Sequence, residues 1–410
     1  MLDLDGLLRF AVDQGASDVH LKVGSRPRLR VDGRLREGPF DTVEPTDTER
    51  LAAGVIPRAR AEAFAATSEC DFMYAIAGLG RFRVSAFRQR GYVGLVLRRV
   101  LPGIPSFEAL GLPETVADLA REQHGLVLIT GLAGSGKTAT IAAMVDHINE
   151  HREGHIVTIE DPVEVLHADK RSIVDQREVG TDTPTTLSGI EHALRQDPDV
   201  IVVGHLIDDA EASAALQAAE IGHLVIAATS TVSAVDSIDR FIELFPPHRQ
   251  RQARATLAAN LRGIVSQRLL PRAGGRGRVA AVEILVNNVR VRERIAGSRL
   301  SELEDEMTVG DLYGMQTFDQ SLVQLYRNGL IERTDAVAAA AAPGEMRFSL
   351  DRADLERDNV AVTPPPVTVS HAPAQAPPPP PPASPEVPPA AAAAAPPPPA
   401  PIASEPVTRA

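Results

Sequence analysis

Hydrophobic and polar residues alternate along much of the first hundred residues, in the period-two pattern of half-buried strands. Turn-forming residues separate these runs, and Asp32–Gly33 is a two-residue hairpin signal. The pattern predicts a small α+β domain with an antiparallel sheet over residues 1–100, followed by a linker over residues 101–111. The expected strands are Val19–Val23, Leu29–Val31, Arg34–Arg36, Arg81–Phe87 and Tyr92–Val100.

Residues 112–345 show a different pattern, in which short apolar runs alternate with stretches of helical periodicity. This alternation predicts an α/β domain whose mostly parallel sheet is covered on both faces and binds ligands at the carboxyl ends of its strands. The expected strands are Leu126–Thr130, Ile156–Ile159, Val200–Val203 and Leu224–Ala228. The expected helices are Thr138–Glu150, Leu187–Arg195 and Asp209–Ile221, with more helix from Arg249 to Leu270 and over Phe318–Arg327.

The segment Gly131–Thr138, with the sequence GLAGSGKT, fits the G-x-x-x-x-G-K-[ST] pattern of a phosphate-binding loop. It stands between an expected strand and an expected helix, which is the context that such a loop requires. Lys137 would reach the β- and γ-phosphates of ATP, and Thr138 would place its hydroxyl on Mg²⁺. The residues expected to bind nucleotide are Gly131, Gly134, Ser135, Gly136, Lys137 and Thr138. The alternative is a glycine-rich turn with an incidental lysine, which the agreement of motif and context disfavours.

Three carboxylates, Glu160, Asp161 and Glu164, follow the next expected strand in the sequence TIEDPVE. They would repel one another unless they share a cation or a proton. Beside Mg²⁺·ATP one of them could orient or deprotonate the attacking water, and we expect Asp161 to join Thr138 at the metal. The alternative is an acidic, solvated loop.

The segment Asp199–Asp209 stands where a phosphate-loop enzyme needs a further acid near Mg²⁺. The apolar run there is followed by His205 instead, and a neutral imidazole is a poor substitute for a carboxylate on a hard cation. Asp208 and Asp209 come later, and we expect them to cap the following helix.

Composition narrows the class of protein. The 410 residues carry a formal net charge of -12, which disfavours a nucleic-acid partner. One cysteine, Cys70, excludes an internal disulfide, fits a reducing compartment, and is expected to be buried. We see no signal peptide and no apolar stretch that could span a membrane, so we expect a cytoplasmic protein.

The C-terminal residues 346–410 are expected to form a disordered tail rich in Pro and Ala. From residue 361 onward they hold 19 of the 33 prolines and three charged residues, Glu386, Glu405 and Arg409. Such a composition cannot bury a core and favours polyproline II segments. The tail is either a flexible spacer or a ligand for a groove-type partner domain.

The chain resembles the PilT-like retraction ATPases of type IV pili, within the type II/IV secretion ATPase superfamily. The resemblance runs over about residues 1–335 and rests on several motifs in the family's order. These are QGASDVHL, RVDG, RFRVSAF, GLAGSGKT (the Walker A loop), TIEDPVE (the Asp box), QREVGTDT, ALRQDPD, AAEIGHLV, SIDRFIELFP, QRLL, GRVAAVEIL and GMQTFDQSL.

The resemblance implies a PAS-like N-terminal domain, a RecA-like ATPase domain and a ring-shaped hexamer that couples ATP hydrolysis to pilus retraction in twitching motility. It also implies a peripheral position at the inner face of the cytoplasmic membrane, against an inner-membrane platform protein. Among the residues, it implies that Glu164 is the catalytic glutamate, with Glu160 beside it, and that His223 is the first His-box histidine. Arg83 and Arg98 resemble the arginines that reach the γ-phosphate across subunits, a task that suits planar guanidinium groups.

The chain departs from the family at three motifs. The family's Walker B segment GEMRD is GHLID here, so His205 replaces the metal-proximal glutamate and Ile207 replaces the arginine. The family's TLHTT is ATSTV, so Ser230 replaces the second His-box histidine. The AIRNLI retraction motif resembles RVRERI at Arg290–Ile295. Loss of the metal-proximal carboxylate is expected to slow hydrolysis by orders of magnitude.

Two functions follow from these observations. The first is a retraction ATPase with attenuated hydrolysis. The second is a non-motor subunit that binds ATP and regulates an active paralogue or joins it in a mixed ring. An extension or type II secretion ATPase is disfavoured, because the chain lacks the longer N-terminal region and the four-cysteine metal site usual in such proteins.

Overall fold

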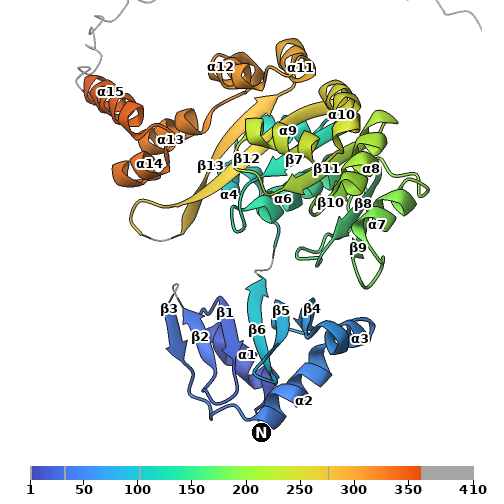
Figure 1. The fold of residues 1–410 in the computed structure, drawn as a ribbon. Coiled ribbons are helices and arrows are strands. Elements are labelled where there is room, and N and C mark those ends of the chain that lie inside the picture. Colours follow the sequence, from blue (N-terminus) through green and yellow to red (C-terminus); the bar gives the residue numbers. More distant parts are fainter. Residues whose placement is uncertain (1, 32–33, 101–102, 276, 362–410) are drawn as a thin grey trace, which may run out of the picture. The chain divides into compact units, whose positions relative to one another are not determined.

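The structure is a computed structural model that describes residues 2–31, 34–100, 103–275 and 277–361 (Figure 1). Its N-terminal part is built on a six-stranded antiparallel sheet with the order β3-β2-β1-β6-β5-β4. The strands are β1 Asp18–Leu21, β2 Arg28–Val31, β3 Arg34–Glu37, β4 Glu69–Ile76, β5 Gly80–Gln89 and β6 Tyr92–Val100. The helices are α1 Leu4–Asp13, α2 Pro45–Val55 and α3 Arg58–Thr67.

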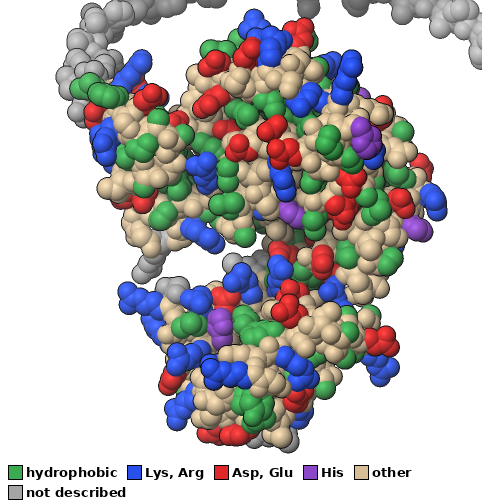
Figure 2. All heavy atoms as spheres, in the orientation of Figure 1, with side chains coloured by type: hydrophobic (Ala, Val, Ile, Leu, Met, Phe, Trp, Pro, Cys, Tyr) green, Lys and Arg blue, Asp and Glu red, His purple; other side chains and the backbone are tan. Residues whose placement is uncertain are grey.

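Side chains on one face of this sheet are buried, because alternate positions of the strands are apolar. Val84 on β5 and Leu97 on β6 lie opposite each other and are fully buried, together with Leu7 of α1 and Phe72 of β4. The other positions are largely polar, and all four residues of the edge strand β3 are exposed. Figure 2 shows Lys and Arg side chains gathered over β2 and β3, where charges blunt an exposed sheet edge.

The second sheet has seven strands in the order β13-β12-β7-β11-β10-β8-β9. All its neighbouring strands are parallel except the pair β12 and β13. Its strands are β7 Gly125–Thr130, β8 His155–Glu160, β9 Ile173–Glu178, β10 Val200–Val203, β11 Leu224–Thr229, β12 Leu261–Pro271 and β13 Arg278–Val286. The central strands β7, β10 and β11 are buried at every position, since helices cover both faces of the sheet (Figure 1).

The helices of this part pack on the sheet or on one another. They are α4 Phe107–Leu110, α5 Glu114–Ala120, α6 Lys137–His151, α7 Thr186–Ala193, α8 Asp209–Glu220, α9 Ala234–Glu243, α10 Pro247–Asn260, α11 Val289–Ala296, α12 Leu303–Thr308, α13 Phe318–Arg327, α14 Arg333–Ala339 and α15 Pro343–Ala361. Two apolar clusters, one on each face of the sheet, form its core: Leu128 and Val203 belong to one, Val127 and Val202 to the other. The α/β architecture and the expected strands of both sheets are confirmed.

Two expectations were wrong. Leu261–Leu270 is not helical: α10 ends at Asn260, and the following residues form β12, which pairs with β7 on one side and β13 on the other. The tail does not begin at residue 346, because α15 packs there with Met346 and Leu350 buried. The hairpin turn at residues 32–33 and the tail from residue 362 onward lie outside the described residues.

Candidate nucleotide-binding and catalytic site

The phosphate loop follows the buried strand β7 and leads directly into α6, as the motif requires. Its glycines Gly131, Gly134 and Gly136 all have positive φ, at 143°, 78° and 100°. A Cβ at Gly131 would collide with the Ser135 hydroxyl and lie 2.6 Å from the Gln267 carbonyl oxygen. Glycine is therefore needed at Gly131 for both the backbone angle and the close approach of β12.

Lys137 is the first residue of α6, and its ammonium group closes over the loop. Its Nζ donates to the carbonyl oxygens of Gly131 at 2.6 Å and Leu132 at 3.2 Å. Burial lowers the pKa of this lysine. The Ser135 hydroxyl is buried and has no hydrogen-bond partner. A buried donor without a partner and a partly desolvated cation are both stabilised by an anion, so the loop fits a phosphate group.

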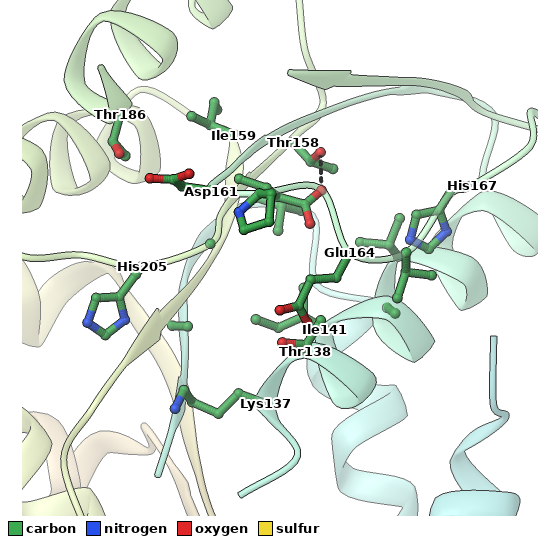
Figure 3. Close-up of a pocket in the computed structure, with 18 of the residues that line it drawn as sticks. Lys137, Thr138, Ile141, Thr158, Ile159, Asp161, Glu164, His167, Thr186 and His205 are labelled. Carbon is green, nitrogen blue, oxygen red and sulfur yellow. Dashed lines mark hydrogen bonds between the residues drawn. The ribbon is translucent and has the colours of Figure 1, made fainter. Parts of the chain in front are cut away.

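A cavity of about 360 Å³ opens beside this loop, at the carboxyl ends of β8 and β10. Figure 3 shows the labelled side chains around it, with Lys137 and Thr138 at the start of α6 and His205 on another segment. The lining residues are Lys137, Thr138, Ile141, Ala142, Val145, Thr158, Ile159, Glu160, Asp161, Pro162, Glu164, Val165, His167, Thr186, Val202, Gly204, His205, Ile207 and Ala228. The structure thus brings the phosphate loop and all three expected carboxylates to one cavity.

Glu160 ends β8 and is the most enclosed of the three carboxylates. Its Oε1 accepts hydrogen bonds from the Thr158 hydroxyl at 2.7 Å and from Gln176 Nε2 at 3.2 Å. Burial raises the pKa of Glu160, and these two hydrogen bonds only partly oppose the rise. The environment of Glu160 therefore favours the protonated form, which suits a group that holds or passes a proton.

Glu164 is more open than Glu160, with 29% of its side chain exposed. Arg83 Nη1 of β5 donates to its Oε1 at 2.9 Å. Arg81, two residues earlier on the same strand, donates to the backbone carbonyl oxygens of Val163 and Glu164 at 2.8 and 3.3 Å. Two arginines thus hold the Asp-box loop, one through the carboxylate and one through the backbone.

Asp161 lies on the same loop but points elsewhere. In Figure 3 its carboxylate extends toward Thr186, and 58% of the side chain is exposed. Asp161 accepts from Arg60 Nη2 at 3.5 Å, and that guanidinium also contacts Glu178 Oε1 at 3.3 Å and the Val179 carbonyl oxygen. The expected role of Asp161 as a metal ligand stays a prediction.

His205 follows β10 and lines the cavity, in agreement with its position just after the expected strand Val200–Val203. Its Nε2 lies 3.4 Å from the Ser230 hydroxyl, so two of the positions that depart from the family pattern contact each other. Burial, and to a lesser extent the Lys137 ammonium, lower the pKa of His205, so the ring is held neutral. Asp208 caps α8 by accepting from the Glu211 N–H at 2.9 Å, and the capping expectation for Asp208 is confirmed.

The structure does not bring His223 or Arg98 to this cavity. His223 precedes β11, at the amino edge of the sheet, where its Nδ1 lies 2.7 Å from the Pro198 carbonyl oxygen. The phosphate loop is at the opposite edge, because β7 and β11 are parallel. Arg98 pairs with the buried Asp18 at 2.7 Å and is 70% exposed. Burial opposes the ionisation of Asp18, but hydrogen bonds from Arg98 and Ser17 outweigh it and lower the pKa.

Three residues of the site were missed from the sequence. Gln176 of β9 links Glu160 to the loop, since its amide also donates to the Val165 carbonyl oxygen and accepts from the His167 N–H. Arg81 could have been found, because it shares the alternation of RFRV with Arg83 and so the same face of β5. Nothing in the pattern marks Arg60, which lies on a helix far from the loop in sequence.

A divalent cation fits this site only together with a nucleotide. Among the described residues no group of three or more His, Cys, Asp or Glu could hold a metal ion alone. The oxygen donors present are the exposed Thr138 hydroxyl at the start of α6 and the cavity carboxylates. Thr138 would hold Mg²⁺ beside the phosphates of the nucleotide. The phosphates would supply most of the ligands of the Mg²⁺ ion, and the ion would stabilise their negative charge.

Comparison with known proteins identifies the class. Residues 2–324 match the family model described as type II/IV secretion system protein, and the chain belongs to this family. The expected resemblance to retraction ATPases is confirmed, as the relatives show.

Two curated relatives come from Pseudomonas aeruginosa. The chain is 39% identical to the type IV pilus ATPase PilU over 349 residues, covering 85% of this chain and 91% of PilU. It is 38% identical to the type IV pilus retraction ATPase PilT over 342 residues, covering 83% of this chain and 99% of PilT. A crystal structure of the pilus retraction motor PilT with bound ADP has a TM-score of 0.77 and 42% identity, over 85% of this chain and 100% of that one.

No helix in the described residues is both long and apolar enough to cross a membrane.

Proposed function

We propose that this chain binds Mg²⁺·ATP in the cavity at the phosphate loop and couples its hydrolysis to retraction of a type IV pilus. The observation that carries the proposal is the meeting of an intact phosphate loop with two carboxylates, Glu160 and Glu164, in one cavity. A base close to the γ-phosphate position is what converts a nucleotide-binding loop into a hydrolase. Pilus retraction is proposed as the task because the relatives are named type IV pilus retraction ATPase PilT and type IV pilus ATPase PilU.

In this proposal Glu164 positions or deprotonates the attacking water, and Glu160 holds a proton behind it. The Arg83 guanidinium occupies one oxygen of the Glu164 carboxylate, so that oxygen cannot take up a water molecule while the contact lasts. Arg83 and Arg98 acting on the γ-phosphate of a neighbouring subunit would require the Arg83–Glu164 contact to open. Such an exchange would tie the release of the base to the arrival of a second subunit.

We further propose a hexameric ring at the inner face of the cytoplasmic membrane, docked on an inner-membrane platform protein. The retraction-motif helix α11 carries Arg294 at a position that is apolar in the family motif, and this arginine pairs with Glu302, just before α12, at 2.8 Å and with Glu306 of α12 at 3.1 Å. These ion pairs fix α11 to its own domain, where the family has apolar positions. A stiffer α11 would alter the coupling between hydrolysis and movement.

A second function is favoured by His205 and Ser230. Hydrolysis is proposed to be slow, because His205 stands where the family has the carboxylate nearest the metal. A chain that binds ATP but turns it over slowly would act as a regulatory subunit, alone or in a mixed ring with an active retraction ATPase. The Pro-rich segment after residue 361 would then serve as a spacer or as a ligand for a further partner.

Binding and turnover of nucleotide test the two functions on the same protein. Lys137→Ala should weaken the binding of fluorescent ADP strongly, since it removes the cation that meets the β-phosphate. His205→Glu should raise ATP turnover by about tenfold or more, because restoring one electrostatic contact is worth about 1.4 kcal/mol or more in the transition state. Adding Glu164→Ala to His205→Glu should abolish the gain.

The outcomes separate the proposals. Equal nucleotide affinity for the wild type and Lys137→Ala would refute the binding site itself. Wild-type turnover at the level of P. aeruginosa PilT, with no response to His205→Glu, would refute the attenuated site and leave the motor function standing. Turnover that stays negligible in every variant while ADP binds tightly would favour the regulatory subunit.

A further inference from the structure

We propose that His205 is a direct ligand of the nucleotide's metal ion, and that Ser230 orients its ring, so that this site prefers a borderline transition metal such as Co²⁺ over Mg²⁺. The inference rests on the proposed binding of nucleotide at this cavity. It concerns residues in which this chain departs from the family pattern, and it changes the identity of the metal rather than only the rate.

The position of His205 carries the first part. It is the second residue after β10, and in Figure 3 its ring faces the same cavity as Lys137 and Thr138. The phosphate-loop residues Lys137 and Thr138 line that cavity together with His205. Thr138, the residue that would touch the metal, directly follows Lys137 at the start of α6. A metal held between Thr138 and the phosphates would therefore lie within the space that His205 faces.

No carboxylate on the same segment competes with the imidazole. Asp208 is committed to the N–H of Glu211 as the cap of α8. Glu211 in turn accepts from the Ile207 N–H at 2.8 Å. Neither Asp208 nor Asp209 lines the cavity, whereas His205 and Ile207 do. Ile207 has no donor atom in its side chain, so His205 is the metal-binding side chain that this segment offers.

The cavity carboxylates on the opposite wall have partners of their own. Glu160 accepts from Thr158 and Gln176, Asp161 contacts Arg60, and Glu164 contacts Arg83. These carboxylates could supply only oxygen ligands to a metal ion. A nitrogen ligand would come from His205, on the segment that follows β10.

Ser230 supplies the contact that metal-bound histidines usually have. Such a histidine donates its other ring N–H to a neighbouring oxygen, which fixes the tautomer and the ring orientation. In the tautomer with the proton on Nε2, that nitrogen donates to the Ser230 hydroxyl 3.4 Å away, and Nδ1 keeps its lone pair for a metal. A histidine at position 230, as in the family motif TLHTT, would place a second ring against the first.

The ligand chemistry then sets the preference. Mg²⁺ favours oxygen ligands and loses water reluctantly, so an imidazole gains little over a water molecule on it. Imidazole nitrogen binds divalent first-row metals with an affinity that rises from Mn²⁺ through Co²⁺ to Ni²⁺ and Cu²⁺. Exchange of carboxylate for imidazole at one position should therefore favour Co²⁺ over Mg²⁺ in the nucleotide complex.

Pulsed electron paramagnetic resonance of the untagged full chain with Mn²⁺·ADP tests the ligand directly. A histidine nitrogen bound to Mn²⁺ modulates the electron spin echo, and ¹⁵N-labelled histidine shifts the modulation frequency. We expect this modulation in the wild type and in His167→Ala, the matched control, because His167 lines the same cavity on another segment. We expect its loss in His205→Ala. The ¹⁵N-histidine sample of the wild type keeps the test valid if His205→Ala fails to fold.

Affinity of fluorescent ADP at saturating metal gives a second readout. The ratio of its dissociation constants with Mg²⁺ and with Co²⁺ should shift toward Mg²⁺ by about tenfold or more in His205→Glu. Ser230→Ala should shift it in the same direction by less. A Mn²⁺·ADP complex that forms without histidine modulation would overturn the inference while leaving nucleotide binding intact. Failure of Mn²⁺·ADP to bind at all would instead refute the proposed nucleotide site, and the inference with it.

Discussion

At the scale of single residues, two glutamates of the site have the same side chain but different surroundings. Glu160 and Glu164 are four residues apart, yet the first is enclosed by neutral donors and the second faces a guanidinium group. Burial raises the pKa of Glu160, whereas the Glu164 carboxylate accepts a hydrogen bond from the Arg83 guanidinium at 2.9 Å. Two carboxylates in one cavity can thus take the two roles of proton holder and base.

Glu283 of β13 shows the same effect away from the site and leads to a prediction of pH-dependent stability. Its carboxylate accepts from the Ala234 N–H at 2.6 Å at the start of α9. Burial raises its pKa from 4.5 to about 7. The folded state therefore binds this proton more tightly than the unfolded state, so the contribution of Glu283 to stability is fully present below pH 4.5 and is lost as the pH rises through about 7.

Glu283→Gln should remove this loss, because the amide stays neutral and its oxygen can still accept from Ala234. The free energy of unfolding should then fall by about 3 kcal/mol less between pH 5 and pH 8 than it does in the wild type. Urea unfolding at a series of pH values measures this. Glu243→Gln, an exposed glutamate on α9, is the control and should follow the wild-type profile. Parallel profiles for the wild type and Glu283→Gln would contradict the prediction.

At the scale of elements, the sequence predicted best where the pattern is continuous. The strands Val200–Val203 and Tyr92–Val100 match the structure at both ends, and the helix expected around Phe318–Arg327 is α13, since apolar residues there recur at helical spacing. β12 was mistaken for helix because a central strand buried on both faces has no alternation to distinguish it from a buried helix. The loop and its carboxylates were placed correctly, because strand ends fix their position.

Contacts between segments far apart in sequence could not be predicted. Gln176 reaches Glu160 because β9 pairs with β8, and Arg60 reaches Asp161 from helix α3; no periodicity in the sequence records either contact. His223 was transferred from a motif, and the motif did not say at which edge of the sheet the residue lies. His223 directly precedes a strand that is parallel to β7, and a residue before such a strand lies at the amino edge of the sheet.

Helix α15 was assigned to the disordered tail from its sequence, yet it packs on the protein and contributes to stability. Leu350 is fully buried against α13 and α14, whereas Phe348, two residues earlier, is 77% exposed. Leu350→Ala should lower the free energy of unfolding by about 2–5 kcal/mol, because it removes a buried side chain and leaves a cavity. Phe348→Ala, the control, should change it by less than about 0.5 kcal/mol. Thermal and urea unfolding compare the two, and equal effects would show that α15 is not packed as described.

At the scale of the whole molecule, each apolar cluster of the described residues lies entirely before or entirely after the boundary near residue 100. One cluster is built entirely from residues 2–79 and 82–97, and the other three contain only residues after 106. The six-stranded sheet likewise closes within residues 18–100. The division into domains at residue 100 stays a prediction, and these cores support it.

A fragment of residues 1–100 should therefore fold without the rest of the chain. We expect a cooperative thermal transition by circular dichroism and dispersed amide signals by NMR, because the fragment keeps its core and every strand pair of its sheet. Phe72→Ala, which removes a fully buried ring from that core, should abolish or sharply weaken the transition. A fragment that is unfolded even without this substitution would mean that the N-terminal sheet depends on contacts with the remainder of the chain.

The contact between His205 and Ser230 also constrains how this protein could have diverged from its family. Two residues that touch across 25 positions of sequence cannot change independently without passing through an ill-matched intermediate. If the two positions changed one at a time from the family motifs, the intermediate had either glutamate at 205 beside serine at 230 or histidine at both positions. The order of those two steps is thus part of the lineage's history, and descendants carrying one substitution without the other should be rare.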